Sequence, residues 1–133
     1  MKVYLSVPMV ANRALDRARL MEKAILDSGH QVSSPWVLGP LERSKPSELN
    51  IFERDKGGVE HSDAIVADVT DPSIGVGMEL MAAHIGGKKV IVVAKKGKVT
   101  SGMLRHMEPK VTVEYDDETE IYTKLCEALN DTG

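Results

Sequence analysis

The sequence predicts an α/β fold: a three-layer α/β/α sandwich around a five-stranded parallel sheet, flavodoxin-like or Rossmann-like. Short apolar runs alternate with amphipathic runs of helix length along the whole chain. This order is typical of a parallel sheet covered by helices on both faces. Several strand runs are almost continuous in Val, Ile and Ala, which is expected of strands buried on both faces.

The elements follow in order. We expect four strands and a weaker edge strand, namely Lys2–Val7, Ala64–Val69, Lys89–Ala94, Val111–Tyr115 and, as the edge, His30–Ser33. The helices are expected at Asn12–Asp27, Ser47–His61, Ile74–Ile85 and Glu118–Leu129. Gly29 and the pair Gly86-Gly87 are suitable helix ends, and Asp117 with Glu120 forms a capping-box pattern.

The 133 residues fit one domain, residues 1–133, with 42% apolar and 28% charged residues. Only 4% are aromatic, so the core must be aliphatic. The long loop Trp36–Ser47 is a candidate ligand border.

A net charge of −3 gives no bulk attraction for a nucleic acid polymer or an anionic membrane. Any anionic ligand must therefore be small and bound by local groups. The four histidines and Cys126 show no metal-ligand spacing, so no metal site is expected. The segment Lys2–Val7 resembles neither a signal peptide nor a membrane span, so we expect a cytoplasmic, soluble protein.

The segment Asp71-Pro-Ser-Ile-Gly-Val-Gly-Met-Glu79 joins a predicted buried strand to a predicted helix. Gly75 and Gly77 leave the first N–H groups of that helix bare, and Ser73 adds a hydroxyl. Such a helix end is suited to bind an anion. A glycine-rich turn that only permits tight packing would show the same spacing, so both explanations remain.

Glu79 follows one turn into the helix, where the helix dipole is expected to hold its carboxylate ionised. An ionised, positioned carboxylate suits a nucleophile. Asp55 lies on the apolar stripe of its helix, between Phe52 and Val59, where an acid needs a partner or a function. Tyr4, in the first strand, has a phenol that can orient a carboxylate. A solvated glutamate, a salt-bridged aspartate and a packed tyrosine are the structural alternatives.

The arginines of the first helix, Arg13, Arg17 and Arg19, are expected to form a mostly solvated face. Only Arg13 lies near enough to the first loop to suggest an anion contact.

Four segments, in this order, resemble the nucleoside 2-deoxyribosyltransferase superfamily, and within it the 2'-deoxynucleoside 5'-phosphate N-hydrolases. They are Tyr4-Leu-Ser-Val-Pro-Met9, Glu53-Arg-Asp55, the run from Ala64 to Leu80, and the run from Gly97 to Arg105. The run from Ala64 to Leu80 is the most specific.

The resemblance implies that Glu79 attacks C1' of the sugar and that Tyr4 orients it. Asp55 would assist departure of the base, and Ser73, Gly75 and Gly77 would hold the 5'-phosphate. It places Pro8 and Met9 in the substrate-binding first loop. Ser101 would reach the phosphate of a neighbouring subunit, which implies a homodimer. No metal or organic cofactor is implied.

The chain departs from the family pattern in the first loop. Val7 replaces a glycine, Pro8 replaces a phosphate-binding serine, and Val10 replaces an arginine. The lost polar groups would have to come from Ser6, Arg13 or Arg105.

The leading hypothesis is therefore a hydrolase that cleaves the N-glycosidic bond of (deoxy)nucleoside 5'-monophosphates. One alternative is a 2-deoxyribosyltransferase that exchanges bases: Pro8 favours it, whereas Ser73 and Ser101 favour the hydrolase. A second alternative is a non-catalytic nucleotide-binding sensor, which would have no need of Tyr4, Asp55 and Glu79 together.

Overall fold

The computed structural model describes residues 1–8, 14–38, 48–98 and 101–130, with the backbone alone for residues 48–50. In chain order the elements are β1 (Lys2–Ser6), α1 (Leu15–Asp27), β2 (Gln31–Val32), the 3₁₀ helix η1 (Pro35–Leu38), α2 (Glu48–Glu60), β3 (Ala64–Asp68), α3 (Ile74–Ile85), β4 (Lys89–Lys95), α4 (Gly102–His106), β5 (Val111–Tyr115), the 3₁₀ helix η2 (Glu118–Glu120) and α5 (Ile121–Asn130).

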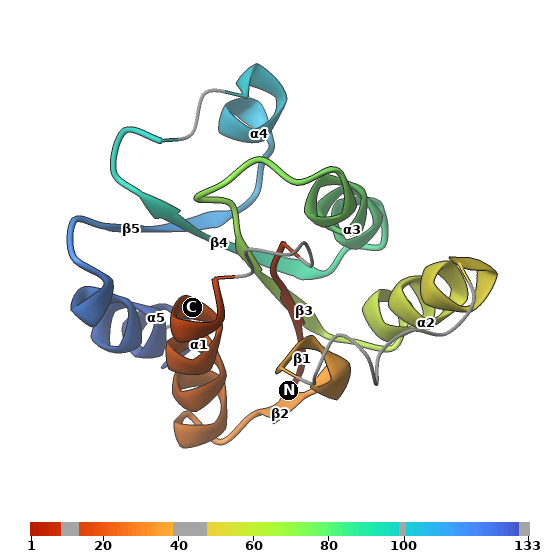
Figure 1. The fold of residues 1–133 in the computed structure, drawn as a ribbon, viewed down its shortest axis with the longest axis horizontal. Coiled ribbons are helices and arrows are strands. Elements are labelled where there is room, and N and C mark those ends of the chain that lie inside the picture. Colours follow the sequence, from red (N-terminus) through yellow and green to blue (C-terminus); the bar gives the residue numbers. More distant parts are fainter. Residues whose placement is uncertain (9–13, 39–47, 99–100, 131–133) are drawn as a thin grey trace.

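The strands form one parallel sheet of five, in the order β2-β1-β3-β4-β5. Helices α1 and α5 pack together on one face, and α2 and α3 cover the other (Figure 1). The predicted three-layer parallel α/β fold is confirmed. The strand order reverses between β1 and β3, and in open sheets of this kind ligands bind beyond the carboxyl ends of the strands at that point.

Strand β1 divides its side chains between the two faces. Val3 and Leu5 are buried in the core beneath α1 and α5, whereas Tyr4 belongs to the core beneath α2 and α3. The alternation follows from the two-residue period of a strand. It aims Tyr4, and with it Ser6, toward α2 and α3.

The helix ends have the glycines and the capping box that the sequence predicts. Gly29 and Gly87 have φ values of 84° and 70°, just past the ends of α1 and α3, a conformation that glycine adopts without steric cost. Asp117 and Glu120 form the predicted capping box.

Most strand and helix boundaries match the prediction to within a single residue, and three differences are larger or change the type of element. The loop expected from Trp36 begins within η1, and the last helix starts as a 3₁₀ turn before it becomes α5. Helix α1 begins at Leu15, and the expected start at Asn12 lies outside the described residues. Helix α4 was not predicted, because a five-residue helix that begins at a glycine has too few turns to show a helical period.

Candidate active site

Glu79 lies at the switch point of the sheet, where the first turns of α3 face the end of β1. The phenol of Tyr4 donates a hydrogen bond to Oε2 of Glu79. The hydroxyl of Ser6 donates to Oε1 of the same carboxylate at 2.8 Å. Tyr4 and Ser6 are two residues apart on one strand and therefore point to the same face. Together they fix both oxygens of Glu79.

Burial determines the protonation of this carboxylate. It raises the pKa of Glu79 to about 7, against the hydrogen bonds from Tyr4 and Ser6, which lower it. The negative charge of Asp55 raises the same pKa, and the positive charge of Arg54 lowers it. The expectation that the helix dipole keeps Glu79 fully ionised is wrong, because near pH 7 both protonation states are populated.

Tyr4 remains a phenol at any ordinary pH. Burial and the adjacent negative charge of Glu79 raise its pKa well above the usual value near 10. A phenol with so high a pKa acts as a hydrogen-bond donor and does not serve as a proton source.

Asp55 projects from α2 into the same region, as predicted. It lines a cavity of 250 Å³ together with Tyr4 and Glu79. Its Oδ1 accepts a hydrogen bond from Nε of Arg54 at 3.0 Å. Two acids thus border one cavity, which is the arrangement that two-carboxylate glycosidic chemistry requires.

The N-terminus of α3 forms one wall of this cavity. Ser73 is its N-cap, and its Oγ accepts the N–H of Val76 at 3.3 Å. Ser73 and Gly75 line the cavity with Glu79. An added Cβ at Gly75 would meet nothing within 4 Å, so the backbone there is open to a ligand.

Gly77 and Ser101 lie on another side of the same helix end. With Ser73 they line a cleft of 520 Å³ between α3 and α4, where Met78, Met81, Met103 and Met107 supply much of the wall. Ser101 caps α4 by accepting the N–H of Leu104 at 3.3 Å. Within one chain, therefore, Ser101 borders a cleft that is distinct from the cavity of Glu79.

The first loop is partly described. Pro8 is buried directly after β1, and Met9 lies outside the described residues, as do Val10 and Arg13. Ser6 is engaged by Glu79 and is not a free replacement for the missing phosphate-binding serine. Arg105 borders a different cavity, of 410 Å³, beside β4 and β5.

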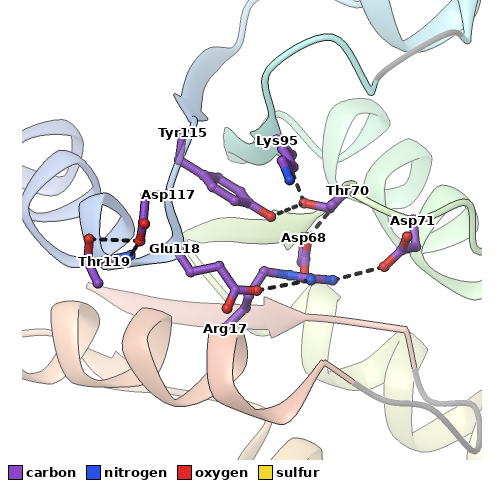
Figure 2. A network of polar contacts seen from close by, with 9 residues as sticks. All are labelled: Arg17, Asp68, Thr70, Asp71, Lys95, Tyr115, Asp117, Glu118 and Thr119. Atoms are coloured by element: carbon purple, nitrogen blue, oxygen red, sulfur yellow. Dashed lines mark hydrogen bonds and ion pairs between the residues drawn. The ribbon is translucent and has the colours of Figure 1, made fainter.

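Arg17 corrects the prediction of a solvated arginine face. Its side chain is only 12% exposed, and its Nε donates to Oδ2 of the fully buried Asp68 at 2.8 Å. Its other nitrogens reach Asp71 at 2.9 Å and Glu118 at 3.4 Å. Figure 2 shows the side chain of Arg17 reaching from α1 to Asp68, with Asp71 and Glu118 on either side of it. The network anchors the segment that leads into the turn before α3.

Comparisons with known proteins identify the family. A protein of Thermofilum pendens is 34% identical to this chain over 138 residues, covering 97% of this chain and 95% of that protein. Its name assigns it to the 2'-deoxynucleoside 5'-phosphate N-hydrolases. The chain belongs to this family. A further relative so named, from Methanococcoides burtonii, is 33% identical over 78% of this chain and 88% of its own length.

A 5-hydroxymethyl-dUMP N-hydrolase of Danio rerio is 37% identical over 75 residues, which are 55% of this chain and 52% of that protein. No family model matches the chain. Membership of the N-hydrolase family confirms the predicted resemblance and the prediction of an N-glycosidase.

Solved structures agree in fold. The CMP N-glycosidase of Clostridium botulinum has a TM-score of 0.76 at 19% identity, covering 96% of this chain and 99% of that one. A 2-deoxyribosyltransferase of Bacillus psychrosaccharolyticus has a TM-score of 0.69 at 21% identity, covering 92% and 90%. The N-hydrolase family member described here thus has the 2-deoxyribosyltransferase-like fold.

The sequence did not reveal the roles of three residues in or beside this candidate site. Ser6 carried a signal, since it lies two positions after Tyr4 on the same strand face. Arg17 also carried one, because it precedes the buried Met21 by one helical turn. Trp36, which lines the cavity of Glu79, is the first residue of the loop that was predicted as a candidate ligand border.

In the part of the chain that the structure describes, no group of three or more His, Cys, Asp or Glu side chains is arranged to hold a metal ion. Nor does any helix there have the length and apolar character to cross a membrane.

Proposed function

We propose that this N-hydrolase family member cleaves the N-glycosidic bond of 2'-deoxynucleoside 5'-monophosphates, with Glu79 as nucleophile. The observation that carries the proposal is the fixed carboxylate of Glu79. Tyr4 and Ser6 each donate to one of its oxygens, and Asp55 lines the same cavity.

The proposed reaction has two steps. In the first, an ionised Glu79 oxygen bonds to C1' as the bond from C1' to the base nitrogen breaks, and Asp55 gives a proton to the departing base. In the second, water attacks C1', the bond to Glu79 breaks, and Asp55 takes up the proton of the water. The products are free base and 2-deoxyribose 5-phosphate with retained configuration at C1'.

Chemical arguments support a 2-deoxy sugar and a 5'-phosphate as parts of the substrate. A 2-deoxy sugar lacks the electron-withdrawing 2'-hydroxyl, so its oxocarbenium-like transition state is easier to reach. The N-terminus of α3 at Ser73 and Gly75 supplies N–H groups and a partial positive charge for the phosphate. No Lys or Arg is among the described residues that line the 250 Å³ cavity, whereas Lys56 lines a second cavity, of 670 Å³, that Asp55, Gly75 and Glu79 also border. We assign the phosphate to the helix end.

The test is product analysis by chromatography. Purified protein is incubated with deoxynucleosides and with deoxynucleoside 5'-monophosphates, each with and without a second base. The proposal requires base release from monophosphates alone, and its loss in Glu79→Gln. Glu127→Gln, an exposed substitution on α5, serves as the matched control and keeps activity. Exchange of bases on unphosphorylated nucleosides would establish the transferase instead, and binding without any release would establish a sensor.

The covalent step has its own test. A monophosphate with an electronegative 2'-fluorine slows both steps by destabilising the oxocarbenium-like transition state. Mass spectrometry of protein quenched with this substrate is expected to show a sugar phosphate ester on Glu79. Full turnover of the ordinary substrate without such an adduct under any quench would contradict covalent catalysis.

We also propose a homodimer in which Ser101 completes the site of the partner. The outer side of α3 and the adjacent α4 expose large apolar side chains: Ile74 is 86%, Met78 57%, Ile85 78% and Met103 74% exposed. A surface of this kind is typical of a protein interface.

A cytoplasmic location likewise remains a prediction.

Complementation tests the shared site. In a heterodimer of Glu79→Gln and Ser101→Ala chains, one site carries both substitutions and the other carries neither. Mixing equal amounts of the two proteins would therefore restore about a quarter of the wild-type sites, because half of the randomly formed dimers are heterodimers and each has one intact site. If Ser101 serves its own chain, mixing restores no activity. Dilution to the monomer, verified by sedimentation, would then leave the activity per chain unchanged.

A further inference from the structure

Arg54 is a cation in direct contact with one of the two acids of the site, and two contacts hold it. Its Nε donates to Oδ1 of Asp55 at 3.0 Å. Its guanidinium carbon lies 4.7 Å from the centroid of the Trp36 ring, within the range of a cation–π contact. The side chains of Arg54 and Asp55 are 22% and 26% exposed, so the pair is largely shielded from water.

Trp36 is itself held by the site. Its ring meets that of Tyr4 edge to face, with centroids 6.3 Å apart and planes at 64°. Gly58 leaves the space for this contact. An added Cβ there would lie 2.7 Å from Cε2 of Tyr4 and 3.2 Å from Cη2 of Trp36. A continuous row of Arg54, Trp36 and Tyr4 thus links Asp55 to Glu79.

We propose that Arg54 is a positioning residue, which is anchored on Trp36 and orients Asp55 for its work on the departing base. The proposal rests on the proposed function. Arg54 engages Oδ1 of Asp55, so Oδ2 is the oxygen that we assign to the base. A guanidinium is suited to this task because its rigid plane stacks on an aromatic ring while its N–H groups bind a carboxylate.

The positive charge of Arg54 also supports the proposed reaction, because it favours the ionised form of Glu79. Among the described residues, the groups that act on the ionisation of Glu79 are Tyr4 and Ser6 from β1, and Asp55 and Arg54 from α2. Asp55 opposes ionisation of Glu79, whereas Arg54 favours it. Two neighbouring acids resist being ionised together, and in the proposed first step Glu79 is the ionised one while Asp55 carries the proton. Arg54 therefore keeps Glu79 reactive at a lower pH than the pair of acids alone would allow.

Steady-state kinetics on a deoxynucleoside monophosphate test the proposal. Arg54→Met is expected to reduce kcat by about tenfold or more, the ratio for one hydrogen bond to a charged group, with little change in KM. The acidic limb of kcat/KM moves to higher pH in Arg54→Met and in Arg54→Gln, because both lose the charge and the stacked guanidinium. Arg54→Lys keeps the charge and returns the limb to its wild-type position. Arg19→Met, an exposed arginine on α1, is the matched control and changes nothing.

Carboxyl ¹³C NMR gives a readout that is independent of turnover. The titration of Glu79, assigned with Glu79→Gln, is expected to move to higher pH in Arg54→Met and to stay in place in Arg54→Lys. Trp36 is the one tryptophan of the chain, so its fluorescence reports loss of the stacked guanidinium directly.

An unshifted Glu79 titration and an unchanged Trp36 emission in Arg54→Met and Arg54→Gln would overturn the role of Arg54. A large rise in KM with kcat intact would also overturn it, because Arg54 would then bind substrate. If the wild-type protein releases no base from any monophosphate, the proposed function fails. The role of Arg54 toward Asp55 and Glu79 is then decided by the titration and the fluorescence.

Discussion

Tyr4 and Glu79 lie 75 positions apart in the sequence, yet the phenol of the first donates a hydrogen bond to the carboxylate of the second. The parallel pairing of β1 with β3 brings them together, since α3 begins just beyond the end of β3. The contact joins the most deeply buried phenol of the site to the proposed nucleophile. Its consequences for rate and stability are measurable.

The first prediction concerns pH and rate. Glu79 must be ionised to attack C1', so kcat/KM is expected to rise with pH through about 7, the pKa that burial gives this carboxyl. Tyr4→Phe removes a hydrogen bond that lowers this pKa, so the acidic limb moves to higher pH and the rate at pH 6 falls by about tenfold or more. A pH–rate profile of both proteins checks this. A limb that stays near pH 4.5 would show that Glu79 is not buried as described.

The second prediction concerns stability. The pKa of Glu79 is raised by burial from 4.5 to about 7, so the folded protein holds a proton that the unfolded chain releases. Stability from this group is therefore present at low pH and lost as pH rises from 4.5 to 7. Glu79→Gln should unfold at a higher temperature than wild type at pH 8.5, with the advantage shrinking toward pH 4.5. Calorimetry at both values measures it, and an advantage independent of pH would contradict the linkage.

The third prediction separates folding from binding at Gly75. This glycine is in the first turn of α3 and its missing Cβ has open space. Gly75→Ala is therefore expected to keep the stability of the fold or to raise it by up to about 1 kcal/mol, the preference for alanine over glycine in a helix. The added methyl group points into the cavity that Glu79 shares. We expect an unchanged or higher melting temperature together with a raised KM for monophosphates. An unchanged KM would place the phosphate elsewhere.

The fourth prediction uses a pair of adjacent glycines in α2. Gly58→Ala drives a methyl group into the rings of Tyr4 and Trp36, whereas the same change at Gly57 meets nothing within 4 Å. Overpacking of this kind costs about 1–3 kcal/mol, and here it also displaces the phenol from Glu79. Gly58→Ala should lose both stability and kcat, with Gly57→Ala as the matched control. Equal behaviour of the two variants in thermal unfolding and turnover would contradict the packing.

The fifth prediction concerns Arg17. Arg17→Met leaves the carboxylate of Asp68 fully buried without its partner, a change that costs about 3–5 kcal/mol in buried pairs. Chemical denaturation measures the loss, and Arg19→Met, an exposed arginine on the same helix, should lose little. Adding Asp68→Asn to Arg17→Met should recover part of it. A double variant no more stable than Arg17→Met alone would show that the ion pair is not the cause.

The fold was predictable because its evidence is local. The Val- and Ile-rich runs mark buried strands, and Gly29, Gly87 and Asp117 mark helix ends by rules that need no tertiary information. Glu79, Asp55 and Tyr4 were selected for a related reason, because each is a polar residue within or next to such an apolar pattern. The resemblance to a family then assigned them to one site. Their catalytic roles remain predictions.

What escaped the sequence depends on long side chains and on pairing across the sheet. Arg17 looks like a surface residue until Asp68 is placed beside it, and nothing local says that an aspartate ending β3 is fully buried. The Arg54–Trp36 contact joins a helix to a 3₁₀ turn, and no period encodes it. The protonation of Glu79 was mispredicted because the dipole of α3 is a local feature, whereas the burial that outweighs it comes from the packed site.

The alternation along β1 has a consequence for how this chain tolerates change. Tyr4 pairs in register with Ile65, and Ser6 with Ala67, so both hydroxyls emerge on the side of Glu79. Sliding β1 by a single residue would present Leu5 and Val7 there and turn the hydroxyls toward α1 and α5. The pairing register of β1 with β3 thus determines which side chains of β1 reach Glu79. A one-residue insertion between Tyr4 and Ser6 puts their side chains on opposite faces of the strand, and we predict that it abolishes activity although every residue of the site is still present.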